Sequence, residues 1–407
     1  MEDIEFSKRF NTTGVCVPEK HYMVNINLKL KEIIKLIQND SYFVINRLRQ
    51  YGKTTTLSEL ERILKSRYKV ISLDFELLDT DFENESRFCE SLIEFMSISL
   101  GIKLQKVDSL SKLSRVISDI TLNEEIILII DEVDKASNNK LFLNFLGMLR
   151  SLYLSRNKGI NTTFKSVILA GVHDIKNLKI KFRDNTDTKY NSPWNIAVNF
   201  NADMSFNIEE IGTMLKEYSN DNNLNMNILK ISKEIYKFTS GYPFLVSRLC
   251  QIIDEDLIGI AKREWEVTDV QKAVKTILIE TNTLFDDLIK NLENNEELYN
   301  TIKQVILGDS RVIYNPYNPS INLGIMFGYF SRDKENYIKI SNLIFSELIL
   351  DYITSKISTE GFGKYTIKQD YLLSTGELDI KKVLIKFSEF MRSAGEKGNN
   401  KFFIPFT

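Results

Sequence analysis

The chain has 407 residues, 43% hydrophobic and 27% charged, so it is long enough for two or three globular domains and is not a disordered chain. Its formal net charge of −2 excludes a generally basic surface, which would indicate a nucleic-acid or membrane partner. The amino-terminal residues lack the pattern of a secretory signal and the apolar runs are only strand-length, which predicts a cytoplasmic protein without a membrane span.

The first half of the chain alternates short β-branched runs with helical patterns, which predicts an α/β domain with a mainly parallel sheet. The run Ile126 to Ile130 is apolar on both faces, as expected of a central strand that is covered on both sides. We expect helices after Lys53, Asn84 and Asn138, and a further one after Ile175. The expected strands are Tyr42–Asn46, Lys69–Phe75, Ile126–Asp131, Ser166–Gly171 and Ile196–Phe200.

The first of these strands leads into a loop and then a helical pattern, the order required of a phosphate-binding loop. In such a loop Gly52 permits close backbone approach, Lys53 reaches the β and γ phosphates, and Thr54 gives its hydroxyl to Mg²⁺. The usual pattern has a glycine where this chain has Arg47. On the loop alone, a turn entering an ordinary helix stays an alternative.

A second element of the same site is the apolar strand that ends in Asp131 and Glu132. In an ATPase the first acid orients Mg²⁺ or its water, and the second polarises the water that attacks the γ-phosphate. The strand Lys69–Phe75 lies between the loop strand and the Asp131 strand. P-loop ATPases with an additional strand and a catalytic glutamate after the Mg²⁺ aspartate look like this, and that class hydrolyses ATP and does not merely transfer its phosphate. After the next strand, His173 and Asp174 are candidate sensors of the γ-phosphate, with an ordinary polar loop as the alternative.

The second half of the chain is predicted to be mainly helical. The polar segment Phe182–Trp194 is predicted as a loop, and two β-like pieces, Ser310–Tyr314 and Asn336–Ile340, follow later helices in an order compatible with a winged-helix module. We therefore expect a P-loop ATPase core in residues 1–205, a helical, lid-like domain in 206–285, and a helical and winged-helix-like domain in 286–407. The helices expected in the lid-like region are Ile208–Tyr218, Asn225–Thr239, Pro243–Ile258 and Thr268–Leu288.

Taken together, these motifs resemble those of bacterial AAA-like P-loop ATPases, a family related to the STAND and archaeal ATPase groups. The resemblance extends from about Phe10 to Arg392. It implies a glycine-poor phosphate loop with arginines, which accounts for Arg47. The motifs that carry it are Arg47 to Thr55, the Asp131-Glu132 strand, Ala170 to Leu178, Ser192 to Ile196 and Ser240 to Val246. The residues that it assigns to the nucleotide are Arg47, Arg49, Gln50, Tyr51, Gly52, Lys53, Thr54, Thr55, Gly241 and Pro243.

The resemblance also suggests roles outside the core strands. STAND-type relatives carry a Gly-x-Pro motif near the nucleotide, matched here by Gly241 and Pro243, although an ordinary helix start is the alternative. Arg248 is then a candidate nucleotide-sensing arginine. Arg156 is a candidate finger acting across a subunit interface, with a solvated helix-end arginine as the alternative. Many relatives continue into a nuclease-like domain, but no Asp followed by Glu-x-Lys occurs after Arg392, so nuclease activity is not expected.

The leading hypothesis is an ATP-binding and ATP-hydrolysing enzyme that uses Mg²⁺ and acts as a nucleotide-dependent conformational switch. Glu132 favours this over a non-hydrolysing, nucleotide-gated scaffold. A DNA-binding regulator under ATP control is a further alternative, which the charge balance does not support. The expected partners are ATP or ADP and either an unidentified protein or a second copy of the chain, with no membrane.

Overall fold

The computed structural model describes residues 7–46, 48–136, 139–171, 194–200, 203–259, 262–308, 311–359 and 380–382. The chain forms two compact units, residues 1–349 and 350–407, and every contact discussed below lies within the first. No helix in the described residues is both long and apolar enough to cross a bilayer. The helix predicted after Ile175 and most of the predicted loop Phe182–Trp194 lie outside the described residues.

A five-stranded parallel sheet forms the centre of the first half of the chain, with the strand order β2-β3-β4-β1-β5. The α/β fold expected from the sequence is therefore present. An additional strand does separate the loop strand β1 from the carboxylate strand β3, but it is β4, whereas β2 lies at the edge of the sheet. Chain order alone could not give this, because parallel strands are joined by crossovers of variable length. The strands are β1 Phe43–Asn46, β2 Lys69–Asp74, β3 Ile126–Asp131, β4 Ser166–Gly171 and β5 Val198–Asn199.

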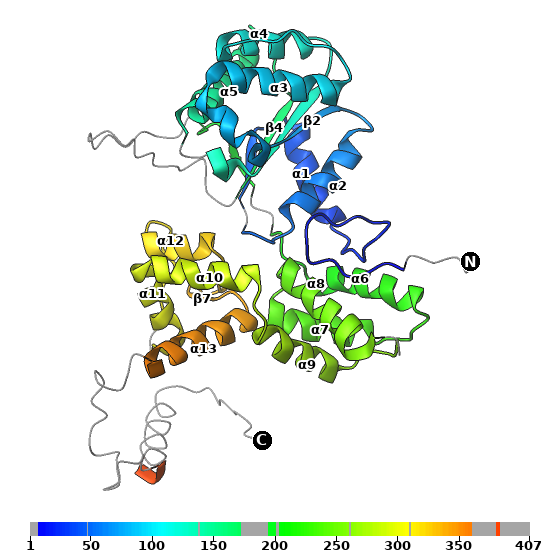
Figure 1. The fold of residues 1–407 in the computed structure, drawn as a ribbon, viewed down its shortest axis with the longest axis vertical. Helices are drawn as coiled ribbons and strands as arrows, with labels where there is room; N and C mark the ends of the chain where they lie inside the picture. The colour runs from blue at the N-terminus through cyan, green and yellow to red at the C-terminus, as the bar shows by residue number, and fades with distance from the viewer. Residues whose placement is uncertain are drawn as a thin grey trace. The chain divides into compact units, whose positions relative to one another are not determined.

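Helices cover both faces of this sheet, as Figure 1 shows. Side chains alternate along each strand, so β1 sends Val44 into the core beneath α3, α4 and α5, and sends Phe43 and Ile45 into the core beneath α1 and α2. Burial on both faces explains why β3 is apolar at every position before its terminal carboxylate. The helices of this region are α1 Asn27–Gln38, α2 Lys53–Leu64, α3 Glu85–Leu100, α4 Leu110–Ile120 and α5 Lys140–Asn157, with 3₁₀ segments at Phe75–Glu83 and Val133–Ala136.

The following helices agree with the predicted pattern except at one place. The expected helix Thr268–Leu288 is two helices, because the side chain of Asn282 accepts a hydrogen bond from the backbone N–H of Phe285 and starts a new helix there. The elements are α6 Ile208–Asp221, α7 Ile228–Thr239, α8 Pro243–Gln251 with a π-helical continuation Ile252–Ile258, α9 Val267–Leu278 and α10 Thr283–Asn294.

The last part of unit one contains a short antiparallel pair of strands among helices. The predicted piece Asn336–Ile340 contains β7, but its partner is β6, and the predicted piece Ser310–Tyr314 contributes only an isolated bridge from Ile313 to Tyr337. The three-residue strand β6 is too short for a period-2 pattern to reveal it. A winged-helix module and the three domain boundaries stay predictions. The elements are α11 Glu296–Leu307, α12 Pro319–Met326, β6 Phe330–Arg332, β7 Ile338–Ile340 and α13 Leu343–Thr359.

Arg156, the candidate finger, lies at the amino ends of the strands, opposite the edge where β3 ends in its carboxylate. Its guanidinium donates to the carbonyl oxygens of Phe164, Lys165 and Asp40 at 2.7, 3.0 and 2.9 Å, and it stacks over the ring of Tyr42 at 5.5 Å. These carbonyls directly precede β4 and β1. Within the chain Arg156 satisfies backbone acceptors where strands enter the sheet, which favours the alternative of a helix-end arginine, and the finger role stays a prediction.

We expect Arg156→Ala to destabilise the protein by about 2–3 kcal/mol, because it removes hydrogen bonds to three carbonyl oxygens, of which that of Phe164 keeps another donor, the hydroxyl of Tyr42. Affinity for ATP should stay within about twofold, since the change is remote from Asp131. Urea unfolding measures the first quantity and calorimetry the second. Arg115→Ala on the exposed face of α4 is the control and should stay within about 0.5 kcal/mol. Unchanged stability of Arg156→Ala combined with lost turnover would contradict this structural role and support the finger.

Candidate functional site

The loop after β1 leads directly into α2, so the free N–H groups of that helix lie at the carboxyl edge of the sheet. Gly52 has φ 74° and Gln50 φ 56°, both in the left-handed region that lets successive N–H groups turn toward one side. The carbonyl of Gly52 accepts from both the N–H and the hydroxyl of Thr56, at 2.9 and 2.8 Å. The local conformation is that of an anion-binding loop.

Thr54 and Asp131 come together across the edge of the sheet. The hydroxyl of Thr54 donates to Oδ2 of Asp131 at 2.9 Å. Both groups are hard oxygen donors, the kind that Mg²⁺ prefers, and Asp131 is 9% exposed. Burial raises the pKa of Asp131, while hydrogen bonds from the N–H of Glu132 and the hydroxyl of Thr54 lower it. These residues fit a Mg²⁺ site that the phosphates and water complete.

Glu132 follows the strand in a conformation that a glutamate rarely adopts. Its φ is 53°, and its N–H donates to Oδ1 of Asp131 at 2.9 Å. A non-glycine residue held in the left-handed region stores backbone strain, and such residues cluster at functional sites. Burial raises the pKa of Glu132, and the ammonium of Lys53 opposes that shift. A carboxylate with a raised pKa is a stronger proton acceptor, as a general base requires.

Lys53 is buried among acidic side chains and is 6% exposed. Its ammonium donates to the carbonyl of Leu48 at 3.0 Å. Burial lowers the pKa of Lys53, and the carboxylates of Glu132, Asp131 and Asp134 oppose this shift. The ammonium of Lys53 offsets part of the negative charge of these three carboxylates.

Asp134 is a site residue that the sequence reasoning missed. A Cβ atom placed on Gly171, at the end of β4, would lie 2.9 Å from both carboxylate oxygens of Asp134. Asp134 therefore adjoins the end of the strand that precedes the sensor candidates. The spacing Asp131-Glu132-x-Asp134 in the sequence indicates Asp134 as a further acidic residue of the site.

The Gly-Tyr-Pro segment at the start of α8 contacts the phosphate loop. Tyr242 donates its hydroxyl to the carbonyl of Arg49 at 2.7 Å, and its ring meets that of Tyr51 edge-on at 4.8 Å. Pro243 occupies the first turn of α8, and its Cβ lies 3.9 Å from where a Cβ of Gly52 would be. The sequence-predicted residues Gln50, Tyr51, Gly52 and Pro243 thus line one cavity, described below.

Gly241 is required by a close backbone approach. Its carbonyl accepts from the N–H of Phe206 at 2.8 Å, and a Cβ on Gly241 would lie 1.9 Å from the carbonyl oxygen of Phe206. With φ 76°, Gly241 also lies in the left-handed region. Any side chain here would push α6 away from the start of α8.

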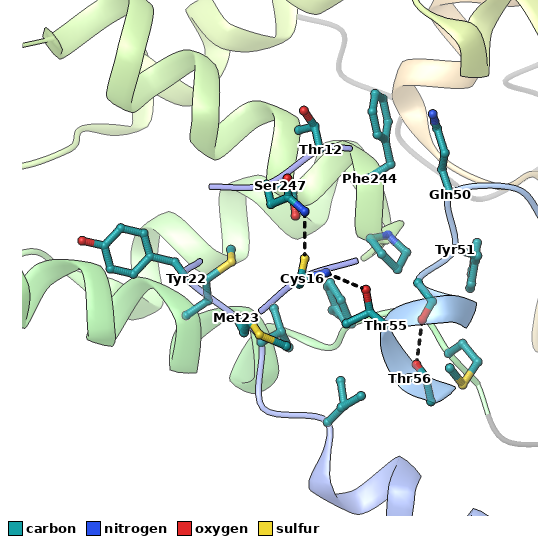
Figure 2. A pocket seen from close by; sticks show the side chains of 18 of the residues that line it. Thr12, Cys16, Tyr22, Met23, Gln50, Tyr51, Thr55, Thr56, Phe244 and Ser247 are labelled. Carbon is teal, nitrogen blue, oxygen red and sulfur yellow. Dashed lines mark hydrogen bonds between the residues drawn. The ribbon is translucent and has the colours of Figure 1, made fainter. Parts of the chain in front are cut away.

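A cavity of about 370 Å³ lies beside the loop, and Figure 2 shows side chains from three parts of the chain around it. The amino-terminal segment contributes Thr12, Cys16, Tyr22 and Met23, α2 contributes Thr55 and Thr56, and α8 contributes Phe244 and Ser247. The N–H of Cys16 donates to the hydroxyl of Thr55 at 3.1 Å. A mostly apolar cavity beside an anion-binding loop suits a nucleobase and ribose.

The amino-terminal segment was not predicted to take part in this site. It is attached mainly to the lid-like helices: Lys8 pairs with Glu217 at 2.5 Å, and Thr12 donates to Gln251 at 3.1 Å. Phe10 packs against the ring of Tyr218 at 5.3 Å. Further along, Lys29 of α1 and Glu210 of α6 form a buried ion pair at 2.5 Å at the cavity wall.

Comparison with known proteins shows the family of the chain. A family model described as an AAA-like domain matches residues 15–343. The chain belongs to the AAA-like domain family. No curated protein matches the chain.

The chain is also similar in fold to solved structures. The Walker-type ATPase of Pyrococcus abyssi is 13% identical, with 84% of this chain and 99% of that one covered and a TM-score of 0.56, which confirms the expected fold. The Aeropyrum pernix ORC2 protein, in ADPNP and ADP complexes, is 12% identical over 86% of this chain and 98% of that one, with a TM-score of 0.45. The Thermotoga maritima RuvB branch migration motor is 12% identical over 82% and 95%, with a TM-score of 0.39.

Other predicted site residues of this AAA-like domain are placed elsewhere or not described. Arg248 makes a bidentate pair with Glu280 at 3.1 and 2.6 Å and donates to Gln251 at 2.8 Å, and it lines neither the nucleoside cavity nor the site around Glu132. Its sensor role stays a prediction. Arg47, His173 and Asp174 lie outside the described residues.

Lys53→Ala should weaken ATP binding by this AAA-like domain at least about tenfold, because the phosphates would then face the neighbouring carboxylates without the buried cation. Isothermal calorimetry with Mg²⁺ and ATP measures the change. Lys65→Ala, at the other end of α2 in an exposed pair with Glu61, is the matched control. ATP binding that survives Lys53→Ala unchanged contradicts the phosphate-loop assignment.

Proposed function

We propose that this AAA-like domain is a Mg²⁺-dependent ATPase that works as a nucleotide-dependent switch. The observation that carries the proposal is the Thr54–Asp131 hydrogen bond, with Glu132 adjacent and Lys53 buried beside both acids. One edge of the sheet thereby brings together a hydroxyl group, an acid to bind the metal, a general base and a cation to bind phosphate.

Each residue has one task in ATP hydrolysis. Lys53 binds the β and γ phosphates, and Thr54 and Asp131 would hold Mg²⁺. When bound, the ion neutralises charge that develops on the phosphates. Glu132 accepts the proton of the water that attacks the γ-phosphate, which its raised pKa favours.

The switch part of the proposal rests on the contacts of Tyr242 and Pro243 with the loop. Because the hydroxyl of Tyr242 bonds the carbonyl of Arg49, a change in loop conformation on nucleotide binding acts directly on the start of α8. Burial raises the pKa of Tyr242, so the hydroxyl stays protonated and remains a donor. If ATP and ADP stabilise different conformations of the loop, they also stabilise different contacts between the loop and the helices of the predicted lid-like region.

Glu132→Gln should reduce turnover by about a hundredfold or more while ATP still binds, because the amide keeps the shape of the side chain but cannot accept the proton. Steady-state phosphate release and calorimetry measure the two effects. Asp131→Asn is the contrasting variant and should instead weaken the Mg²⁺ dependence of binding. If the unaltered protein binds ATP tightly but shows no turnover, the scaffold alternative replaces the enzyme.

Tyr242→Phe should reduce the difference between the ATP-bound and ADP-bound states, since it removes the bond to Arg49 but keeps the ring against Tyr51 and Phe345. Nucleotide affinity should fall only about twofold to fivefold. Limited proteolysis across residues 200–225, with each nucleotide and with none, detects the difference. Tyr218→Phe, which removes a hydroxyl bond to Asp254 inside the lid-like helices, is the control. If the unaltered protein gives the same cleavage pattern with ATP, with ADP and without nucleotide, the switch proposal is wrong.

A further inference from the structure

A second cavity of about 380 Å³ adjoins the phosphate loop, and α10 forms part of its wall. Its charged lining residues are Arg49 from the loop, Glu132 and Asp134 from the segment after β3, and Asp287 from α10. Since Glu132 is the proposed base, this cavity lies at the γ-phosphate end of the site. Helix α10 therefore faces the place where ATP and ADP differ.

Three successive loop residues contact the chain from α10 onward. The guanidinium of Arg49 pairs with the carboxylate of Asp287 at 3.2 Å, and the amide of Gln50 donates to the hydroxyl of Thr283 at 2.9 Å. Leu48 packs so closely on Gly328 that a Cβ there would lie 2.1 Å from Leu48 Cδ1. The same Leu48 accepts the hydrogen bond of Lys53 through its carbonyl. The loop that receives phosphates is thus also the contact surface for α10.

The charges around this cavity make the two roles of the loop compete. The charged groups that line it are three carboxylates and the guanidinium of Arg49, and the ammonium of Lys53 lies near Glu132 and Asp134. A γ-phosphate therefore adds negative charge beside Asp287 and attracts Arg49. Arginine binds phosphate with a rigid fork of donors, which makes the phosphate a strong competitor for it. The pair to be broken is weak, since Arg49 is 68% exposed and Asp287 37%.

We propose that Arg49 is a γ-phosphate ligand that exchanges Asp287 for the triphosphate, so that ATP, and not ADP, loosens α10 from the phosphate loop. The inference rests on the proposed function, because it requires the γ-phosphate to lie near Glu132. A diphosphate lacks the group that competes with Asp287 and leaves the Arg49–Asp287 pair in place. By linkage, the pair weakens binding of ATP relative to ADP by the same factor by which ATP weakens the pair, so a change at Asp287 that removes the pair strengthens binding of ATP relative to ADP.

The test measures the affinities of the full chain for ADP and for the non-hydrolysable imido analogue of ATP, both with Mg²⁺, by calorimetry. Asp287→Asn should tighten binding of the analogue by about threefold to fivefold and leave ADP within about 1.5-fold, the range expected for loss of an exposed ion pair. Asp286→Asn is the matched control, with the same charge change on an exposed neighbour in the first turn of α10 that does not line the cavity. It should change neither affinity.

A second variant tests whether the exchange passes through Arg49. In an Arg49→Ala background, Asp287→Asn should no longer favour the analogue, because there is no guanidinium to release. An undiminished gain in that background would show that charge repulsion alone acts, and it would overturn the exchange. An equal gain for Asp286→Asn would also overturn it.

The outcomes separate this inference from the proposed function. If the unaltered chain binds both nucleotides and Asp287→Asn shifts them equally or not at all, the exchange is wrong and the ATP site stands. If the unaltered chain binds neither nucleotide, the ATP site itself is wrong, and the exchange is overturned with it.

Discussion

The hydrogen bond from Thr54 to Asp131 joins two segments that lie 77 residues apart in the chain. It brings the start of α2 to the end of β3. The parallel sheet makes this contact possible because all of its strands end at one edge. The buried lysine and the strained glutamate depend on the same arrangement. The acids at the end of β3 and after it oppose the lowering of the Lys53 pKa by burial, and the N–H of Glu132, a residue in the left-handed region, donates to Asp131.

The phosphate loop is supported from more than one direction. Tyr242 bonds it from the start of α8, and Asp287 and Thr283 bond it from α10. Each of these contacts is modest, yet all of them act on Arg49 and Gln50. The conformation of the loop therefore depends on contacts with α8 and α10 as well as on its own sequence. A change in the loop would also change these contacts.

The sequence predicted what local patterns encode. The runs that are apolar on both faces identified the central strands, and the order strand, Gly52-Lys53-Thr54, helix identified the loop, because both signals lie within a few residues. Local patterns do not encode where an element or side chain lies in the tertiary structure. Long-range packing decides which strand lies between β1 and β3, and it decides that Arg156 binds carbonyls at the far edge of the sheet. The same holds for Cys16 and Asp287, since neither belongs to a motif and each reaches the site only through tertiary contacts.

The backbone contact between Phe206 and Gly241 fixes the start of α6 to the start of α8. The packing of α7 against both neighbours joins α6 to α8 into one block of helices. The segment containing Lys8 and Thr12 is bonded to this block, although it precedes the sheet in the chain. A fluorophore attached near Lys8 would consequently report on the surroundings of α6, where Lys8 pairs with Glu217.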